Sequence, residues 1–410
     1  MTIAIIGGGA AGMMAMATIL EHDKNARVIL IERNPELGNK VIISGGGRCN
    51  VTTGIRSIKT LFTKYPRGSK FLTSAFYAFP PETVYEWFEA HGVPLKIEKD
   101  LRVFPVSNDG HDIVGVFEKM SSSKRVTLKI SHTVQAIKKD GEIFTITCKD
   151  KPEITADKVI IATGGQAYRH TGSQGDGYTF SEMLGHTITD LAPSLSSYII
   201  RDEHIKELAG VSWGFAQLST PRTKKEKPEG PFMFTHSGIT GPVVFAFSAL
   251  YAFEKIASNN PLPILINLFP ETPKEKTMDM FSKQKIENGR KSIENTLATI
   301  VPKSIAHYIL MNNRIDPLKN IADCNKKELE KIVDTVHGMP FHVIGRGAGD
   351  EFVTAGGVET SEVSPQTMES LITPGLFFAG EILNIDGFTG GYNLQASWAT
   401  GRLAGLHAIE

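Results

Sequence analysis

The sequence predicts an α/β fold in which one parallel-sheet domain is interrupted by a long insertion. Short apolar runs that end in small or acidic residues recur at 2–6, 27–32, 158–165 and 375–381, as expected of buried parallel strands. A different pattern occupies residues 191–345. At 410 residues the chain is also longer than one hydrophobic core usually supports, so more than one domain is expected.

The first apolar run opens a unit of strand, helix and strand. Residues 2–6 (TIAII) predict a buried strand that ends at Gly7, and residues 11–22 are good helix formers. Residues 27–32 (RVILIE) predict a second strand that ends in an acid. Parallel strands joined by a helix form a right-handed crossover. Further on, residues 121–150 alternate apolar and polar around the turn KKDGE, which predicts antiparallel strands.

The middle region has a different character. Short strand-like pieces split by Gly and Pro come first, and from residue 271 to about 337 the sequence becomes helical and charged. We therefore expect residues 1–190 and 346–410 to form one discontinuous domain. Residues 191–345 are expected to form an inserted domain, with a β part followed by helices.

Composition excludes several classes of protein. Lys and Arg together number 44 and so do Asp and Glu, so no global charge favours nucleic acid, a membrane surface or an acidic partner. The first twenty residues carry no charge, but they lack a basic start and contain four glycines, which excludes a signal peptide and a spanning helix. Cys49, Cys148 and Cys324 are too widely spaced for a disulfide framework or a zinc site. We expect a cytoplasmic protein without a metal.

Gly7, Gly9 and Gly12 form the pattern G-x-G-x-x-G between the first strand and the first helix. The first glycine permits a tight turn, the second lets a pyrophosphate approach the backbone, and the third lets the helix pack closely on the strand. The helix N-terminus offers free N–H groups to the phosphates. Glu32, at the end of the second strand, is placed to accept hydrogen bonds from ribose hydroxyls. The pattern predicts a Rossmann-like dinucleotide-binding domain.

The C-terminal segment favours FAD over NAD(P) as the dinucleotide. A strand there is followed by Gly380 and Glu381, then by Asp386, then by Gly390 and Gly391 at the start of a last helix. Many flavoproteins close on FAD with such a unit, in which the acid meets the ribityl or pyrophosphate region. The helix N-terminus then faces the pyrimidine edge of the flavin and stabilises negative charge when the flavin takes a hydride.

Several motifs together resemble a known family. The runs GGGAAG, GNKVIISGGGRCNVT, FTHSGITGP and GFTGGYNLQ resemble the aminoacetone-oxidase-like family of FAD-dependent flavoproteins. The chain is also similar to bacterial reductases that act on bile-acid enones and on a uridine of ribosomal RNA. The resemblance spans essentially the whole chain. It implies a discontinuous FAD-binding domain of the glutathione-reductase type, interrupted by an insertion with β-barrel-like and helical parts.

The resemblance also implies which residues hold the cofactor. The loop after the second strand would wrap FAD, with Arg48 contacting phosphate or the flavin carbonyls. The full set expected to bind FAD comprises Gly7, Gly9, Ala10, Ala11, Gly12, Glu32, Arg33, Lys40, Ser44, Gly45, Arg48, Asn50, Val134, Ala162, Thr163, Gly164, Gly380, Glu381, Asp386, Gly391, Tyr392, Asn393 and Leu394.

Two further side chains are candidates for chemistry. His236, in the glycine-rich turn FTHSGITGP of the insertion, is a candidate proton donor or acceptor, and a hydrogen-bonded turn histidine is the alternative. Cys49 as a redox centre would need a partner, and the sequence contains neither C-x-x-C nor C-x₄-C. We therefore favour a buried, unreactive Cys49.

The sequence predicts an enzyme that moves a hydride between a substrate and flavin N5. An oxidase of a C–H bond next to an amine, as in aminoacetone, and a reductase of an activated C=C bond, in an enone or a uracil ring, both stay open. A non-catalytic FAD-binding scaffold is the third alternative. Residues 343–358 imitate a second G-x-G-x-x-G unit but lack the last glycine and the helix, so NAD(P)H would bind only transiently. The substrate is expected to be a small molecule or a nucleobase. The neutral net charge does not indicate rRNA but leaves it open, and no stable protein partner is implied.

Glu32→Ala tests the ribose interaction. Loss of a charged hydrogen bond should weaken FAD binding by on the order of 1.5–3 kcal/mol. Titration of the apoprotein with FAD, followed by flavin fluorescence, measures this change. An unchanged affinity would remove Glu32 from the site.

Overall fold

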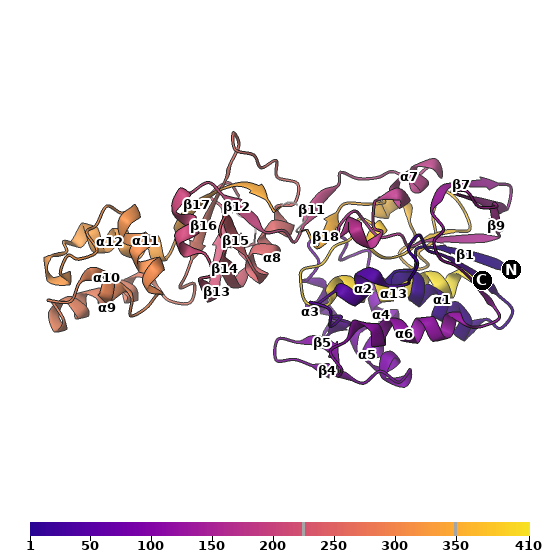
Figure 1. Ribbon diagram of the computed structural model, residues 1–410, viewed down its shortest axis with the longest axis horizontal. Coiled ribbons are helices and arrows are strands. Elements are labelled where there is room, and N and C mark those ends of the chain that lie inside the picture. Colours follow the sequence, from indigo (N-terminus) through magenta and orange to yellow (C-terminus); the bar gives the residue numbers. More distant parts are fainter. Residues whose placement is uncertain (224–225, 348–350) are drawn as a thin grey trace. The chain divides into compact units, whose positions relative to one another are not determined.

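The structure is a computed structural model that describes residues 1–223, 226–347 and 351–410. Two compact units divide the chain (Figure 1). Unit 1 comprises Met1–Ser194 and Phe352–Glu410, and unit 2 comprises Leu195–Glu351. The chain therefore leaves unit 1 once and returns to it for the final segment. Residues 224–225 lie outside the described residues, as do residues 348–350 of the 343–358 segment.

A five-stranded parallel sheet organises unit 1. Its strands lie in the order β19-β10-β1-β2-β6. They span Thr2–Ile6 (β1), Arg27–Ile31 (β2), Val126–Lys129 (β6), Lys158–Ile161 (β10) and Leu376–Phe378 (β19). Every neighbouring pair is parallel, and β10 bridges the N-terminal β1 and the C-terminal β19. The α/β class and the return of the last segment to the first sheet are thus confirmed.

The predicted antiparallel strands over residues 121–150 are only partly right. β7 (Val134–Asp140) and β8 (Ile143–Cys148) do form an antiparallel hairpin, extended by β9 (Ile154–Ala156). β6, in contrast, joins the edge of the parallel sheet beside β2. An edge strand exposes part of its surface, as Leu128 does at 37%, so it shows the alternation that was interpreted as antiparallel.

Helices α1 (Ala10–His22) and α13 (Tyr392–Ala408) pack against each other in unit 1 (Figure 1). Residues Ala10 to Ile19 of α1 are all buried, as expected of a helix covered on all sides. A Cβ on Gly401 of α13 would collide with the carbonyl oxygen of Ala11. Glycine at this contact therefore lets the two backbones approach closely.

The other elements of unit 1 surround this arrangement. A small sheet contains β3 (Thr52–Thr53), β5 (Arg102–Pro105) and β4 (Leu95–Ile97), and β11 (Ala192–Ser194) pairs with β18 (Val353–Ala355). The remaining helices are α2 (Asn39–Ile43), α3 (Ile58–Phe62), α4 (Thr73–Ala78), α5 (Pro81–Ala90), α6 (Gly110–Ser121) and α7 (Asp176–Met183), with short 3₁₀ turns at Arg169–Thr171 (η1), Thr360–Glu362 (η4) and Gly380–Ile382 (η5).

Unit 2 combines a closed six-stranded barrel with a group of helices. The barrel order is β12-β15-β14-β13-β16-β17. Its strands span Tyr198–Ile200 (β12), Ser212–Ser219 (β13), Glu229–Phe234 (β14), Gly238–Thr240 (β15), Leu262–Asn267 (β16) and Met339–Arg346 (β17). The helices are α8 (Pro242–Leu250), α9 (Lys274–Glu287), α10 (Ile293–Leu297), α11 (Lys303–Asn312) and α12 (Lys326–Val336), with 3₁₀ turns at Glu203–Leu208 (η2) and Ile321–Asp323 (η3). The barrel and its helices share a hydrophobic core separate from that of unit 1.

The described residues contain neither a membrane-spanning helix nor a metal-binding cluster. None of their helices has the length and apolar character needed to cross a membrane. Within the same residues, no group of three or more His, Cys, Asp or Glu side chains is arranged to hold a metal ion.

Candidate functional site

The glycine turn after β1 is shaped by close backbone contacts. Gly7 has φ 108°, and a Cβ there would lie 2.5 Å from the carbonyl oxygen of Ala162 at the end of β10. A Cβ on Gly12 would collide with the carbonyl oxygen of Gly7. At Gly9, by contrast, a Cβ would meet nothing within 4 Å. Backbone contacts within the protein therefore require glycine at positions 7 and 12, whereas Gly9 borders open space.

The N-terminus of α1 presents free donors beside this space. Gly9 is the N-cap and supplies no side-chain hydrogen bond, and the first helical bond runs from Met13 N to Gly9 O over 2.9 Å. The N–H groups of Ala10, Ala11 and Gly12 consequently have no acceptor within the helix. Together with the helix dipole they form a donor set suited to phosphate.

Glu32 is held against the glycine turn. Its Oε2 accepts a hydrogen bond from Gly8 N over 2.7 Å, and its Oε1 accepts one from Asn34 N over 2.8 Å. The side chain is buried beside the turn, and each oxygen keeps a lone pair for a further donor. This arrangement suits the ribose contact expected from the sequence.

Arg33 and Val134 lie close to this region of the chain. Arg33 forms an ion pair with Asp176, in the first turn of α7. Asp176 is the first residue of α7 and follows the N-cap, Gly175. Val134 is the buried first residue of β7.

A polar cluster joins α2 to the chain segments after β10 and β19. Lys40 Nζ lies 3.0 Å from Glu381 Oε2 and 3.2 Å from Ser173 Oγ. Glu381 Oε1 accepts a hydrogen bond from Thr354 N over 2.9 Å. A Cβ on Gly164, which has φ 72°, would lie 2.9 Å from Ser173 Oγ. The structure thus brings together residues that the sequence separates widely.

The end of β10 contributes a buried hydroxyl. Thr163 Oγ1 is buried and has no hydrogen-bond partner among the residues that the structure describes. It follows Ala162, whose carbonyl oxygen faces Gly7. Gly380, after β19, has φ 79°, and a Cβ there would lie 2.9 Å from Ala11 Cβ. The ends of β1, β10 and β19 therefore meet at the start of α1.

The glycine-rich loop that follows α2 packs on the hairpin of β4 and β5. Gly45, Gly46 and Gly47 all have positive φ, and a Cβ on Gly45 would lie 2.9 Å from the ring of Phe104. Ser44 Oγ donates to Val41 O over 2.7 Å. These contacts hold the loop in place. Glycine adopts the positive φ angles of its backbone more readily than any other residue type.

Arg48 is engaged by the same hairpin. Its guanidinium lies 3.8 Å from the centroid of Phe104, and Nη1 lies 2.7 Å from Glu98 Oε1. From the sequence, Arg48 was expected to contact phosphate or the flavin carbonyls, and its ion pair with Glu98 was missed. Glu98 lies in the turn between β4 and β5, and no sequence motif marks it as a site residue.

Cys49 is fully buried and has φ 55°. Burial raises the pKa of its thiol to about 12, with a smaller opposing contribution from Ser44. The thiolate form, which is the nucleophile, is therefore absent at neutral pH. The geometry favours a packing role for Cys49 over a reactive one.

The N-terminus of α13 is a second set of free donors. Gly391 is its N-cap, with φ 85°, and a Cβ there would collide with the carbonyl oxygen of Thr52. The first helical bond runs from Gln395 N to Gly391 O over 2.9 Å, so the N–H groups of Tyr392, Asn393 and Leu394 have no acceptor within the helix. This is the arrangement expected at a flavin pyrimidine edge.

Asn50 fixes the start of α13. In the amide orientation that satisfies both of its ends, the oxygen accepts from Gly391 N over 2.8 Å, and the nitrogen donates to Thr52 O over 3.1 Å. Asn50 therefore binds the cap of the helix. Asp386 likewise binds protein groups, since Arg67 and Ser194 donate to its carboxylate. No sequence motif marks Arg67 as a partner of Asp386.

His236 belongs to unit 2. It lies in the turn between β14 and β15, is exposed, and is flanked by a hydrogen bond from Thr235 N to Gly238 O of 2.8 Å. The cofactor candidates all belong to unit 1. The hydrogen bond between Thr235 and Gly238 makes the turn that carries His236 a tight hairpin connection.

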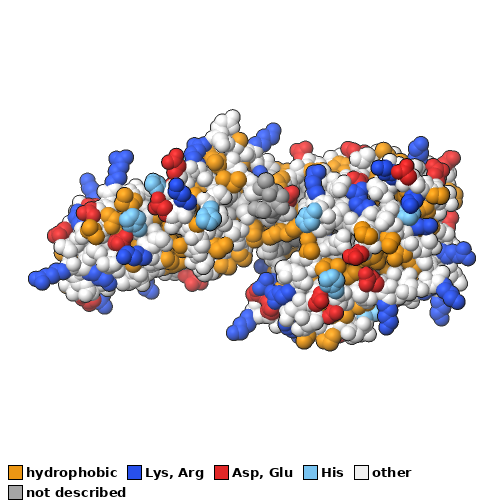
Figure 2. Space-filling model, viewed as in Figure 1, with side chains coloured by type: hydrophobic (Ala, Val, Ile, Leu, Met, Phe, Trp, Pro, Cys, Tyr) orange, Lys and Arg blue, Asp and Glu red, His pale blue; other side chains and the backbone are white. Residues whose placement is uncertain are grey.

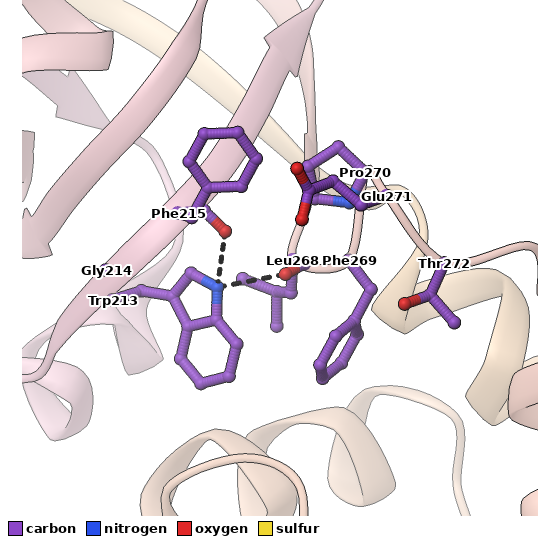
Figure 3. Close-up of a pocket in the computed structure, with 8 residues that line it drawn as sticks. All are labelled: Trp213, Gly214, Phe215, Leu268, Phe269, Pro270, Glu271 and Thr272. Atoms are coloured by element: carbon purple, nitrogen blue, oxygen red, sulfur yellow. Dashed lines mark hydrogen bonds between the residues drawn. The ribbon is translucent and has the colours of Figure 1, made fainter.

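Unit 2 also contains a shallow apolar pocket of about 370 Å³ (Figure 3). Trp213 Nε1 donates to the carbonyl oxygens of Phe215 and Leu268 over 2.9 and 3.0 Å, which fixes the indole ring. The ring of Phe269 meets it edge-on at 5.5 Å. The pocket lacks His236 and the cofactor candidates, so we do not assign the reaction to it.

The turn, the acid after β2 and the two helix N-termini define unit 1 as a Rossmann-type dinucleotide-binding domain. A family model described as the HI0933-like protein Rossmann domain matches residues 1–407. The chain belongs to this family and is an FAD-dependent oxidoreductase. The resemblance seen in the sequence motifs is thereby confirmed.

Two curated relatives match over nearly the whole chain. A 3-dehydro-bile acid delta(4,6)-reductase of Clostridium scindens is 28% identical over 100% of this chain and 99% of its own. A ribosomal RNA dihydrouridine synthase of Escherichia coli is 28% identical over 97% of this chain and 95% of its own. Among solved structures, a 3-ketosteroid delta1-dehydrogenase from Sterolibacterium denitrificans superposes with a TM-score of 0.53 at 12% identity, covering 99% of both chains, which shows a shared fold.

The residues of unit 1 fit FAD. Gly9 leaves the space that a pyrophosphate needs, and the N–H groups at the start of α1 supply donors for it. Glu32 offers acceptors for ribose, and α13 offers donors for the opposite end of the cofactor.

Two glycine variants separate cofactor binding from folding. Gly9→Ala places a methyl group in open space, so the apoprotein should keep its thermal stability but lose FAD. Gly12→Ala drives a methyl group into the Gly7 carbonyl and should destabilise the fold by about 1–3 kcal/mol or more. Circular dichroism melting and flavin absorbance measure the two effects. Full FAD occupancy in Gly9→Ala would contradict the phosphate role.

Thiol titration tests the assignment of Cys49. All three cysteines are free and buried, and burial raises the pKa of each thiol. The native protein should therefore not react with a disulfide reagent between pH 7 and about 9. Unfolding should expose all three thiols. Cys49→Ala should keep near-normal turnover. Rapid labelling of native Cys49 with loss of activity, while FAD stays bound, would make the cysteine catalytic.

Proposed function

We propose that the protein is a reductase that saturates a C=C bond conjugated to a carbonyl group. The observation that carries the proposal is the donor set at the start of α13, which favours negative charge at one end of a bound flavin. The two full-length relatives support this direction. Their names denote saturation of ring double bonds in a 3-oxo bile acid and in uracil, and both reactions are carbonyl-conjugated reductions.

FAD supplies the hydride chemistry when it is bound. The chain supplies binding and electrostatics. The N–H groups of α1 would bind the pyrophosphate, and Glu32 would accept from ribose. The ion pair of Lys40 and Glu381 joins α2 to the segment after β19. The N-terminus of α13 would favour the reduced flavin, because the positive end of the helix dipole stabilises the negative charge that hydride uptake brings.

The proposed reaction needs one hydride and one proton. The hydride, with its two electrons, adds to the carbon farther from the carbonyl, and a proton adds to the carbon next to it. We propose His236, an exposed side chain of unit 2, as the proton donor. Cys49 is excluded as the donor by its burial and its raised pKa.

The electrons are proposed to come from NAD(P)H. Segment 343–358 resembles a second dinucleotide fingerprint in sequence. Among its described residues, 343–346 belong to β17 and 353–355 to β18, and none of them lies in an α-helix. NAD(P)H is therefore proposed to dock transiently at the flavin. The proposed compartment is the cytoplasm, where this reductant is plentiful and thiols stay reduced.

A small-molecule substrate is proposed in preference to RNA. Lys+Arg and Asp+Glu balance at 44 each. On the face drawn in Figure 2, cationic and anionic side chains are interspersed, without a broad patch of one sign. Binding that neutralises several phosphates requires such a patch.

Anaerobic mixing tests the reaction and its direction. NADH or NADPH should bleach the flavin of the holoenzyme, and a 3-oxo-4-ene steroid should restore its colour without dioxygen. Bleaching by aminoacetone with reoxidation only by dioxygen would reject the reductase in favour of the amine oxidase. Restoration by a uridine-containing RNA alone would reject the small-molecule substrate.

His236→Gln tests the proton donor. Turnover should fall by about 10²-fold or more, while the rate of flavin reduction by NAD(P)H stays normal, because only the proton transfer to substrate is affected. The matched control is His342→Gln, which changes an exposed histidine on β17 of the same unit. Normal turnover and an unchanged pH profile in His236→Gln would remove His236 from the mechanism.

A further inference from the structure

Asp386 is a buried carboxylate in the loop between η5 and α13, and its side chain is 0% exposed. Arg67 donates to both of its oxygens, from Nε to Oδ1 and from Nη2 to Oδ2. The hydroxyl of Ser194 donates to Oδ2 over 2.8 Å. Burial raises the pKa of this carboxyl, and Arg67 and Ser194 oppose the shift. Protein donors thus engage both oxygens.

The residue after Asp386 is tied to the first turn of α13. Gly387 N donates to Asn393 Oδ1 over 2.8 Å, and Asn393 Nδ2 donates back to Gly387 O over 2.9 Å. Asn393 carries one of the three free N–H groups at the start of the helix. Any movement of the loop at Asp386 is therefore passed directly to these donors.

A second segment, residues 64–67, holds the same loop from outside. Phe388 N donates to Lys64 O over 2.9 Å, and Tyr65 OH donates to the carbonyl oxygen of Tyr392 over 2.6 Å. The backbones of Arg67 and Asp386 also form an antiparallel bridge. The ion pair is one of several contacts that lock this segment onto the start of α13.

Ser194 adds a connection to the point where the chain leaves unit 1. It is the last residue of β11 and of unit 1 before the chain enters unit 2. The next residue, Leu195, has φ 58°, a left-handed conformation that is rare for a bulky side chain and persists only where its surroundings enforce it. The bond to Asp386 fixes the residue immediately before this strained position.

We propose that Asp386 is a positioning residue that sets the placement of the α13 N-terminus against the flavin, through Arg67 and Ser194. This inference uses the part of the proposed function in which α13 faces the flavin, and it does not depend on the substrate. In this proposal the carboxylate acts through the protein groups that it binds, and not as a cofactor ligand. Its removal relaxes the loop and weakens the electrostatic support that the helix gives to the reduced flavin.

Asp386→Asn in the holoenzyme tests the proposal. The variant should retain FAD, its flavin reduction potential should become more negative, and turnover should fall roughly tenfold to a hundredfold, less than the loss of an oxyanion donor itself. A redox titration against a reference dye measures the potential without any substrate. Asp140→Asn, at an exposed carboxylate at the end of β7, is the matched control and should leave both readouts unchanged.

Milder variants keep the proposal testable if Asp386→Asn does not fold. Ser194→Ala removes one hydrogen bond and leaves the ion pair, and Tyr65→Phe removes the bond to Tyr392 O. Both should shift the potential in the same direction by a smaller amount. A folded Asp386→Asn that loses FAD would make Asp386 a cofactor ligand, and an unchanged potential in all three variants would make the cluster purely structural. A shifted potential in an enzyme without reductase activity would reject the proposed function alone.

Discussion

The close approach of backbones around the first turn of α1 is the constraint on which unit 1 depends. Gly12 lies against the carbonyl oxygen of Gly7, Gly7 against that of Ala162, and Gly401 against that of Ala11. A side chain at any of these three glycines would collide with the neighbouring carbonyl group. The result is that the ends of three parallel strands meet at the start of α1, and the middle of α13 packs against the same turn. The helix N-termini then supply donors without any charged side chain, and the cofactor site follows from this geometry.

Charged side chains around the site are largely compensated by one another. Arg33 pairs with Asp176, Lys40 with Glu381, Arg48 with Glu98 and Arg67 with Asp386. Ion pairs that offset each other add little net field at a distance. In the proposed site, the dipoles and free N–H groups of α1 and α13 therefore provide the larger directed interaction with an anionic cofactor.

The sequence predicted the parts of the molecule that depend on local pattern. The turn of Gly7 to Gly12, the strand before it, the helix after it and Glu32 follow from spacing alone, and the return of the C-terminal strand follows from a repeated motif. The sequence did not reveal contacts between distant residues. Arg67 and Asp386 are 319 positions apart, and Lys40 and Glu381 are 341 apart. The parallel pairing of β6 was missed because an edge strand alternates in either orientation.

The interrupted course of unit 1 has a consequence for how the protein is made. β10 ends at Ile161, but its neighbour β19 begins only at Leu376, after the whole of unit 2. During synthesis the apolar edge of β10 and the face of α1 that α13 covers stay open until the last segment emerges from the ribosome. Unit 2 has its own core and can fold in that interval. A chaperone that shields the uncovered sheet edge would therefore protect the nascent chain most at this stage.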